Sequence, residues 1–427
     1  MRTNGEEVRN AMRVGEQRHP ERASNGKPLD GVSVLAVEQM QALPYATQLL
    51  AHLGAAVVKV EPPGRGDSGR LAQPALTDKD GRRVGATYLR NNLGKRSIAI
   101  DLKHAEGRAL FERLVPHFDV VAENMRPGAM DALGLGPGAI ANLAPRAIYL
   151  SISGFGARGA SPYRDWPAYA PVAEAMAGLY EPNRRGDAPP PTVVAGALGD
   201  IATALFSVIG VQAALRHRER TGLGQVVDVA MLDSMIAVSD MPPFLWSMGA
   251  PERWASSGSL GICAAFRAKD GFFVVAVFRE HQFERLAHAM GNPQWVGDAR
   301  FATREDWARN TETVVRPALE AWARDKTKLE AARALTALGI VAGPSNTAAD
   351  LAGDPHVRER GMLIEVPRPD GGRDMLVVGN PVKLSRVAEG PIATFPSLGE
   401  HTNSVLRATL GLGDEALARL RAAGVIG

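Results

Sequence analysis

The sequence predicts an α/β protein with a parallel sheet in a large first domain and a smaller α/β domain behind it. Short Val-rich runs alternate with segments of helical spacing, which is typical of strands that alternate with helices in a parallel sheet. The chain has 427 residues, and a single hydrophobic core usually stops growing at roughly 250 to 300 residues. Hydrophobic residues make up 45% and charged residues 22%, as in folded globular proteins. We therefore expect two domains.

The first strand is expected in GVSVLAVEQ (31–39), and ATQLLAHLGA (46–55) follows it with the spacing of a helix. AAVVKVEPPG (55–64) is a second Val-rich strand, and its two prolines end it. The alternation continues through SIAIDLK (97–103), the helical EGRALFERLV (106–115), DVVAEN (119–124) and AIYLSISGFG (147–156). Buried parallel strands have such short apolar runs.

Beyond the strands, residues 200–220 have the pattern of one long helix, and residues 225–238 read as a strand or helix that enters a new region. The sequence then changes in character. AAFRAKDGFFVVAVF (264–278) predicts a hairpin, with helices expected at 282–291 and 310–326. These elements predict a smaller α/β domain over residues 263–364, and a last helix is expected in DEALARLRAAGVI (414–426).

Charge and cysteine content exclude several classes of protein. The formal net charge is +3 and the basic residues are scattered, so we expect no nucleic-acid partner. Cys263 is the only cysteine, which excludes an intrachain disulfide framework and favours the cytoplasm. The first 27 residues lack the apolar stretch of a secretory signal. No run approaches the roughly 18 to 20 apolar residues of a membrane span, so we expect no membrane contact.

The common catalytic motifs are also missing. The sequence has no Walker loop, no convincing dinucleotide fingerprint and no G-x-S-x-G elbow. His281, His356 and His401 form no helical pair at ligand spacing, so we expect no metal site. Carboxylates remain, and Asp200 stands out in PPTVVAGALGD (190–200), at the start of the long helix. An acidic residue there can simply cap the helix, so the pattern alone leaves catalysis open.

Seven segments in the same order resemble the class III CoA-transferase family (CaiB/BaiF type). Its relatives include formyl-CoA transferase, carnitine CoA-transferase and the α-methylacyl-CoA racemases. The segments are LDGVSVL, HLGAAVVKVEPPGRGD, NNLGKRSIAIDLK, ENMRPGAMDALGLG, SISGFG, TGLGQVVDVAMLD and LGEHTNSVLRATLGL. The resemblance implies a CoA-transferase that moves coenzyme A from an acyl-CoA to a carboxylic acid, with coenzyme A as substrate and no permanently bound cofactor.

The resemblance also implies roles for three residues. Asp200 falls on the family's catalytic aspartate and would form an anhydride and then a CoA thioester, because an ionised carboxylate can attack a thioester without a partner base. Gln41 falls on a glutamine beside that aspartate in formyl-CoA transferase, where its amide would hold an oxyanion; a surface or capping glutamine is the structural alternative. Tyr169 falls on a tyrosine of formyl-CoA transferase and on the catalytic histidine of the racemases.

Two other functions stay open. A racemase needs two groups that titrate near neutral pH, and tyrosine, with a reference pKa near roughly 10, is a poor substitute for histidine. Glu280 resembles an acidic position of the racemases and keeps that alternative, although a solvated charge explains it as well. The third possibility is a CoA-binding protein without transfer chemistry, which would not need both Asp200 and Gln41.

For coenzyme A, the resemblance implies contacts on the loops after the strands, where each side chain also has an ordinary solvated or structural interpretation. The residues are Met40, Ala42, Ile100, Asp101, Leu102, Lys103, Asn124, Met125, Arg126, Pro167 and Ala168. Pro62 and Ala132 replace arginines of formyl-CoA transferase, with Arg65 or Arg126 as substitutes, and Ala170 replaces a glutamate. Gly258 and Gly261 remain from that enzyme's glycine-rich loop and would provide a mobile lid.

The family's fold implies an interlocked homodimer with a large Rossmann-like domain. With the residue patterns, it gives a disordered N-terminal extension at 1–28 and a large CoA-binding domain at 29–225, completed by about 385–427. A linker is expected at 226–262, the small α/β domain at 263–364 and a return linker at 365–384. The partners are then an acyl-CoA donor, a carboxylic acid acceptor and a second copy of the chain.

Overall fold

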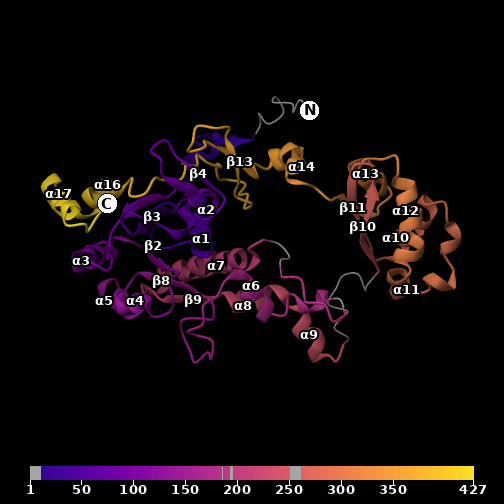
Figure 1. Cartoon of the computed structure of the whole chain (residues 1–427), viewed down its shortest axis with the longest axis horizontal. Coiled ribbons are helices and arrows are strands. Elements are labelled where there is room, and N and C mark those ends of the chain that lie inside the picture. Colours follow the sequence, from indigo (N-terminus) through magenta and orange to yellow (C-terminus); the bar gives the residue numbers. More distant parts are fainter. Residues whose placement is uncertain (1–10, 185, 193–195, 251–260) are drawn as a thin grey trace. The chain divides into compact units, whose positions relative to one another are not determined.

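The computed structural model describes residues 11–184, 186–192, 196–250 and 261–427 (Figure 1). The chain forms two compact units, each with its own hydrophobic core. Unit 1 comprises Met1–Leu179, Thr192–Val238 and Gly353–Gly427, and unit 2 comprises Tyr180–Pro191 and Ser239–Ala352. Residues 353–364, which were predicted in the small domain, therefore belong to unit 1, as do the whole predicted return linker and the last part of the chain.

Unit 1 is built on a parallel sheet of six strands in the order β6-β3-β2-β7-β8-β9. The strands are β2 (Ser33–Val37), β3 (Ala56–Glu61), β6 (Arg96–Ala99), β7 (Val120–Glu123), β8 (Ile148–Ser153) and β9 (Val226–Ala230). Counted along the chain from β2, the order is 3-2-1-4-5-6, that of a Rossmann-like sheet. The prediction of a parallel α/β sheet is confirmed.

Helices cover both faces of this sheet (Figure 1). Val34 and Ala36 of β2 point to one core, and Leu35 and Val37 to the other, because successive side chains of a strand alternate. The first core is covered by α1 (Ala42–His52), α6 (Ala170–Met176), α7 (Leu198–Thr221) and α8 (Met231–Ser239). The second is covered by α3 (Ala105–Leu114), α4 (Ala129–Ala132), α5 (Pro137–Leu143), α16 (Thr402–Leu410) and α17 (Asp414–Ala422).

The helix α7 is long and apolar enough to cross a membrane, judged by length and composition alone. The expectation that no segment reaches this limit was therefore wrong. Half of its apolar window is buried, and Val208, Val211 and Leu215 lie in the first core of unit 1. A core helix of a folded domain passes the same test, so the length of α7 carries no argument for a membrane span.

Two predicted borders of the domains need correction. The chain before residue 29 is not wholly disordered, because β1 (Met12–Arg13) pairs in parallel with β13 (Leu363–Val366), which pairs with β14 (Met375–Val378). The predicted return linker thus contributes two strands to a small sheet. The predicted linker at 226–262 contains β9, the sixth strand of the main sheet, so the large domain continues past residue 225.

Unit 2 contains an antiparallel sheet in the order β10-β11-β12, made of β10 (Ile262–Ala268), β11 (Gly271–Val277) and β12 (Val341–Pro344). The hairpin expected at 264–278 is confirmed, with Ala268 opposite Gly271 at its turn. Phe283 and Trp307 stack in the core with ring centroids 4.5 Å apart. The helices of unit 2 are α9 (Met241–Ser247), α10 (Glu280–Ala289), α11 (Arg304–Arg309), α12 (Arg316–Ala323) and α13 (Lys328–Ala337).

The remaining elements are short and connect these parts. They are α2 (Ala86–Asn91), the hairpin strands β4 (Ala75–Thr77) and β5 (Arg83–Gly85), and the helices α14 (Ala348–Gly353) and α15 (Pro355–Glu359). The helix α2 lies between the hairpin and β6, and its last turn contains Arg90.

Candidate active site

The carboxyl ends of β2 and β7 form the point where the strand order of the main sheet reverses. The loops that follow these two strands are tied together, because the Gln39 N–H donates to Asn124 Oδ1 at 3.0 Å and Asn124 Nδ2 donates to the Gln39 carbonyl at 2.9 Å. In open α/β sheets, ligands bind in the crevice at this position. Residues 100–103, 124–126 and 167–169 follow β6, β7 and β8, so the structure brings the predicted segments to the same edge of the sheet.

Met40 carries the chain from β2 into α1 in a left-handed conformation. Its φ is 64°, which is uncommon for a residue with a side chain and typical of functional loops. The Met40 N–H donates to Asp67 Oδ1 at 2.9 Å, and Asp67 Oδ2 pairs with Lys59 Nζ at 2.7 Å in a fully buried contact. This buried ion pair holds the turn and places Gln41 directly before the first residue of α1.

A second buried ion pair lies beside the first, on the same loop. Lys95 Nζ donates to Glu38 Oε1 at 2.7 Å, and Thr47 Oγ1 donates to Glu38 Oε2 at 2.7 Å. Burial lowers the pKa of Lys95 to about 8, although the neighbouring Glu38 carboxylate works against this shift. Removing one partner of a buried ion pair typically costs about 3 to 5 kcal/mol. The loop that carries Met40 and Gln41 is therefore fixed by charges beneath it.

Asp200 is the third residue of α7, and its carboxylate accepts a hydrogen bond from the N–H of Ala42, the first residue of α1. Burial raises the pKa of Asp200 to about 6. The Arg90 guanidinium lowers that pKa, the Glu174 carboxylate raises it, and the Ala42 N–H lowers it. The N–H groups of a first helical turn favour an anion. The predicted helix start is confirmed, but the hydrogen bond comes from α1, not from the helix that contains Asp200.

Glu174 of α6 caps the helix that carries Asp200. Its Oε1 accepts the N–H of Gly199 at 2.9 Å, and the residue is only 1% exposed. A Cβ at Gly199 would lie 3.0 Å from the Cα of Ala170, a tight contact that glycine avoids. The first turns of α6 and α7 therefore pack directly together, which brings a second carboxylate near Asp200.

Gln41 lies at the start of α1 and is 7% exposed. Its Oε1 accepts a hydrogen bond from Arg90 Nη2 at 2.5 Å. A guanidinium only donates, so this contact fixes which end of the amide is oxygen and leaves the Gln41 amide N–H groups pointing elsewhere as donors. The arrangement combines a partly buried carboxylate, an oriented amide donor and a positive charge, which suits attack on a carbonyl and stabilisation of its oxyanion.

Comparisons with known proteins identify the family. A family model described as CoA-transferase family III matches residues 29–402. The chain belongs to CoA-transferase family III. It is 34% identical over 408 residues to the succinyl-CoA–L-malate CoA-transferase beta subunit of Chloroflexus aurantiacus, covering 93% of this chain and 98% of that one.

The names of other relatives also combine succinyl-CoA with a dicarboxylic acid. The chain is 35% identical over 390 residues to succinyl-CoA:mesaconate CoA-transferase of Haloarcula marismortui, with 88% of this chain and 95% of that protein covered. It is 31% identical to human succinyl-CoA:glutarate CoA-transferase, with 94% and 91% covered. A CaiB/BaiF family protein from Brucella suis has the same fold, with a TM-score of 0.77, 32% identity and 90% and 99% of the two chains covered. This chain is thus a CoA-transferase.

Tyr169 occupies the position before the first residue of α6, and its side chain is 74% exposed. Its carbonyl accepts the N–H of Val172 at 2.9 Å. Tyr169 therefore directly precedes the helix that contains Glu174, and its ring points into solvent. Its role in this family III chain stays a prediction.

The predicted CoA-binding residues differ in how accessible they are. Lys103 and Arg126 are exposed, as expected of phosphate ligands, and so is Pro167. Ile100 is only 1% exposed and lies in the second core, so its side chain is part of the packing under the sheet edge. Met40 is exposed in the loop before α1, and Ala42 is buried as the first residue of that helix. The remaining residues are partly buried in the loops: Asp101, Leu102, Asn124, Met125 and Ala168.

The structure shows how far the positions that depart from formyl-CoA transferase are buried or exposed. Ala170 is 3% exposed and packs against Gly199, which leaves no room there for a glutamate. Arg65 is exposed and available as a substitute for the missing arginines, as Arg126 is. Gly258 lies outside the described residues, so the predicted lid has no structural test. Glu280, which kept a racemase open, is an exposed residue of unit 2 that pairs with Arg304 at 2.7 Å.

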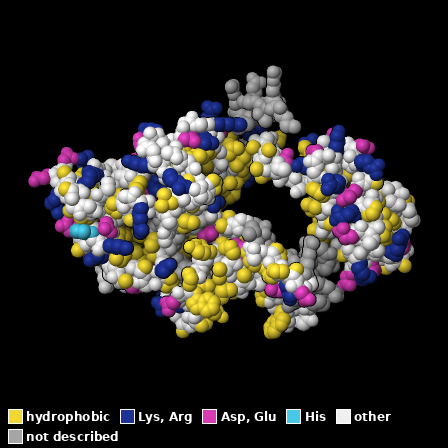
Figure 2. Space-filling view, in the orientation of Figure 1, with side chains coloured by type: hydrophobic (Ala, Val, Ile, Leu, Met, Phe, Trp, Pro, Cys, Tyr) yellow, Lys and Arg dark blue, Asp and Glu magenta, His cyan; other side chains and the backbone are white. Residues whose placement is uncertain are grey.

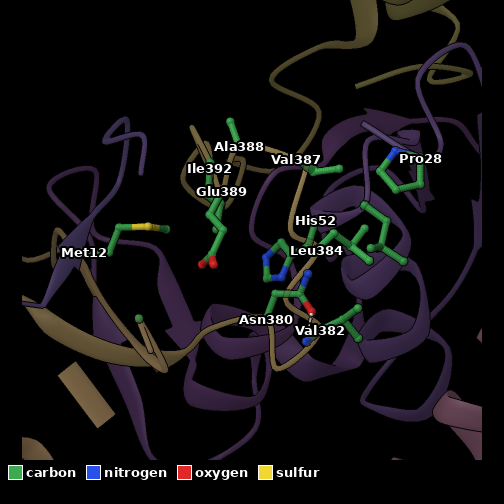
Figure 3. Close-up of a pocket in the computed structure, with 13 residues that line it drawn as sticks. Met12, Pro28, His52, Asn380, Val382, Leu384, Val387, Ala388, Glu389 and Ile392 are labelled. Atoms are coloured by element: carbon green, nitrogen blue, oxygen red, sulfur yellow. Dashed lines mark hydrogen bonds between the residues drawn. The ribbon is translucent and has the colours of Figure 1, made fainter. Parts of the chain in front are cut away.

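One small cavity of about 30 Å³ lies away from this edge of the sheet, at the far end of α1 (Figure 3). His52 ends that helix, with Asn380 and Glu389 beside it across the cavity. Both ring nitrogens of His52 are buried and, within the described part of the chain, have no hydrogen-bond partner. Burial lowers the pKa of His52 to about 4, assisted by the charges of Lys27, Lys95 and Lys383. The space is too small for a substrate.

Arg90, Glu174 and Asp67 are residues of the site that the sequence did not reveal. Each acts across a long stretch of chain. A signal existed for two of them, because Asp67 ends the matching segment HLGAAVVKVEPPGRGD and Arg90 directly precedes the matching segment NNLGKRSIAIDLK. No group of three His, Cys, Asp or Glu side chains in the described ranges could hold a metal ion.

Proposed function

We propose that this chain transfers coenzyme A through covalent intermediates on Asp200. An oxygen of the Asp200 carboxylate attacks the thioester carbon of the donor, the C–S bond breaks, and a mixed anhydride and CoA thiolate form. The thiolate attacks the aspartyl carbon, which releases the donor acid and leaves an aspartyl-CoA thioester. The acceptor carboxylate attacks this thioester and forms a second anhydride. The returning thiolate then attacks the acceptor's carbonyl carbon, so that the new acyl-CoA leaves and the carboxylate is restored.

The observation that carries this proposal is the setting of Asp200. Its carboxylate is partly buried at the start of α1, beside Gln41. With a pKa of about 6 it is mostly ionised at pH 7, and its poor hydration favours attack. The oriented amide of Gln41 would donate to the oxyanion that develops on the thioester carbonyl. No general base is needed, because no step of the cycle moves a proton.

We infer that the acids are dicarboxylic. The named relatives combine succinyl-CoA with malate, mesaconate or glutarate, and each of these acids carries a second carboxylate. The positive charge of Arg90 at the site would favour a substrate with that extra negative charge. The coenzyme itself would lie along the carboxyl edge of the sheet, with Lys103 and Arg126 toward its phosphates.

We also propose that the chain acts as a cytoplasmic homodimer. The outward side of α7 exposes Leu205, Phe206 and Ile209 at 45%, 37% and 61%, and hydrophobic side chains gather over this part of unit 1 (Figure 2). A contiguous apolar surface of this kind is typical of a protein interface. Interlocking of two chains is the arrangement that the family resemblance implies. Light scattering should give twice the chain mass, and Ile209→Asp should lower it.

The decisive test compares Asp200→Ala and Asp200→Asn with the wild-type protein. Both variants should lose the exchange of labelled acid into acyl-CoA while they still bind coenzyme A. Incubation of the wild type with succinyl-CoA should give an adduct on Asp200 that hydroxylamine removes, visible by mass spectrometry. Asp325→Ala, a change at an exposed residue of unit 2, is the matched control and should exchange normally. Exchange by Asp200→Ala would rule out the mechanism.

A further inference from the structure

Arg90 carries the positive charge that acts on Asp200, and this charge forms no ion pair with the described residues. Lys59, Lys95 and Arg70 are buried and pair with Asp67, Glu38 and Glu61. Arg90, in contrast, is exposed, and no carboxylate of the described residues lies within ion-pair distance of it. Its guanidinium nevertheless lies close enough to Asp200 to lower the pKa of that carboxyl group.

Arg90 is held at its backbone by Gln48 of α1 and at the tip of its side chain by Gln41, which precedes α1. Its backbone carbonyl accepts a hydrogen bond from Gln48 Nε2 at 3.1 Å, and Gln48 is fully buried. At the tip, Arg90 Nη2 donates to Gln41 Oε1 at 2.5 Å. A long side chain on a surface normally samples many rotamers, so these two bonds fix the guanidinium at the edge of the site before a substrate arrives.

Gln41 occupies one N–H of the guanidinium, and none of the other residues that the structure describes accepts from its remaining donors, which could therefore bind a ligand. The planar guanidinium matches a carboxylate, which it can bind through two parallel hydrogen bonds. The reacting carbonyl of a substrate must lie at Asp200, so an acyl group that reaches Arg90 would present its far end there. We propose that Arg90 binds the second, non-reacting carboxylate of a dicarboxylic acyl group and so selects dicarboxylic over monocarboxylic substrates.

This inference rests on the proposed function, and it assigns Arg90 a second task besides orienting Gln41. A purely orienting role would change the rate with every acid alike, because Gln41 serves the thioester carbonyl that all acyl-CoA donors share. Binding of the far carboxylate would instead change the ratio between acids. The ratio is therefore the quantity that separates the two roles.

The test uses two donors of equal chain length, succinyl-CoA and butyryl-CoA, with glutarate as the common acceptor. We expect the wild type to prefer succinyl-CoA in kcat/KM, and Arg90→Gln to lower that preference by about 10- to 100-fold, the value of a hydrogen-bonded charge. Arg90→Lys keeps the charge without the planar fork and should retain part of the preference. Arg113→Met, which changes an exposed arginine of α3, is the matched control and should leave both rates unchanged.

Gln41→Ala completes the design, because it removes the oriented amide and one of the two hydrogen bonds to Arg90 but keeps the guanidinium itself. It should lower transfer from both donors and lower their ratio less than Arg90→Gln does. An unchanged ratio in Arg90→Gln, or a wild-type preference for butyryl-CoA, would overturn the role of Arg90 and leave the transfer mechanism standing. Failure of the wild type to transfer coenzyme A from either donor would overturn the proposed function, and this inference with it.

Discussion

The ionisation of Asp200 should control how the transfer rate depends on pH. Burial and the Glu174 carboxylate raise the pKa of Asp200 to about 6 against the opposing charge of Arg90. The carboxylate is then about 90% ionised at pH 7 and about 10% ionised at pH 5. In the proposed mechanism only the ionised form attacks the thioester, so kcat/KM for the donor should fall about tenfold between these two values of pH.

Glu174→Gln separates charge from structure at this site. Glutamine keeps an oxygen that can accept the Gly199 N–H, but it removes the negative charge that raises the pKa of Asp200. The midpoint of the pH profile should therefore move to lower pH, so that the variant exceeds the wild type in relative rate at pH 5. Glu415→Gln, at an exposed position of α17, should leave the profile unchanged.

The assay follows exchange of labelled acid into acyl-CoA between pH 4.5 and 8, with samples returned to pH 7 to check that activity recovers. A rate that stays constant from pH 7 to pH 5 would refute a nucleophile with a pKa of about 6. A midpoint that moves upward in Glu174→Gln would refute the electrostatic effect assigned to this residue.

Three further predictions concern stability and coenzyme binding. His52 is neutral in the folded protein down to about pH 4, whereas the histidine of the unfolded chain takes up a proton near pH 6.5. The free energy of unfolding should therefore be greatest above pH 6.5 and fall by about 3 kcal/mol as the pH drops to 4. In urea titrations, His52→Phe should reduce this fall. Asp67→Asn leaves Lys59 buried without its nearest carboxylate, so the free energy of unfolding should drop by about 3 to 5 kcal/mol, and a change below 1 kcal/mol would contradict the anchoring role of this pair. Lys103→Ala should weaken coenzyme A binding, measured by calorimetry, and reduce the salt dependence of that binding. Binding of pantetheine thioesters, which carry no phosphate, should be unaffected. Equal weakening of both ligands would exclude a phosphate contact.

The sequence predicted the sheet well because each strand carries its own local signal. The Val-rich runs around Val34, Val58 and Val121 are short and apolar, and all three lie in parallel strands. The pairing of Met12 with Ile364 could not be predicted, since it joins residues far apart in the chain and β1 has only two residues. The strand β9 was left undecided between strand and helix because the apolar run continues directly into α8.

The site was predicted only as far as motifs extend. Asp200 and Gln41 were predicted through the family resemblance; Gln41 directly precedes α1, and Asp200 of α7 has its carboxylate at the N–H of Ala42, the first residue of α1. Arg90 and Glu174 act on Asp200 through space, and charge interactions of this kind leave no periodic pattern in a sequence. The exposed ring of Tyr169 could not be foreseen either, because exposure depends on how the loop after β8 folds.

The opposing charges around Asp200 address a conflict in the proposed chemistry. A carboxylate that is well solvated and strongly paired is a weak nucleophile, whereas one that is fully buried takes up a proton at neutral pH. Burial and Glu174 push Asp200 toward protonation, and Arg90 and the Ala42 N–H hold it ionised, with the balance near pH 6. If Arg90 also binds the far carboxylate of a substrate, that carboxylate would neutralise part of the guanidinium charge and so raise the pKa of Asp200. At a pH well above the raised pKa, where Asp200 stays ionised, substrate binding would then strengthen the nucleophile only for acids that reach Arg90, which links selectivity to rate.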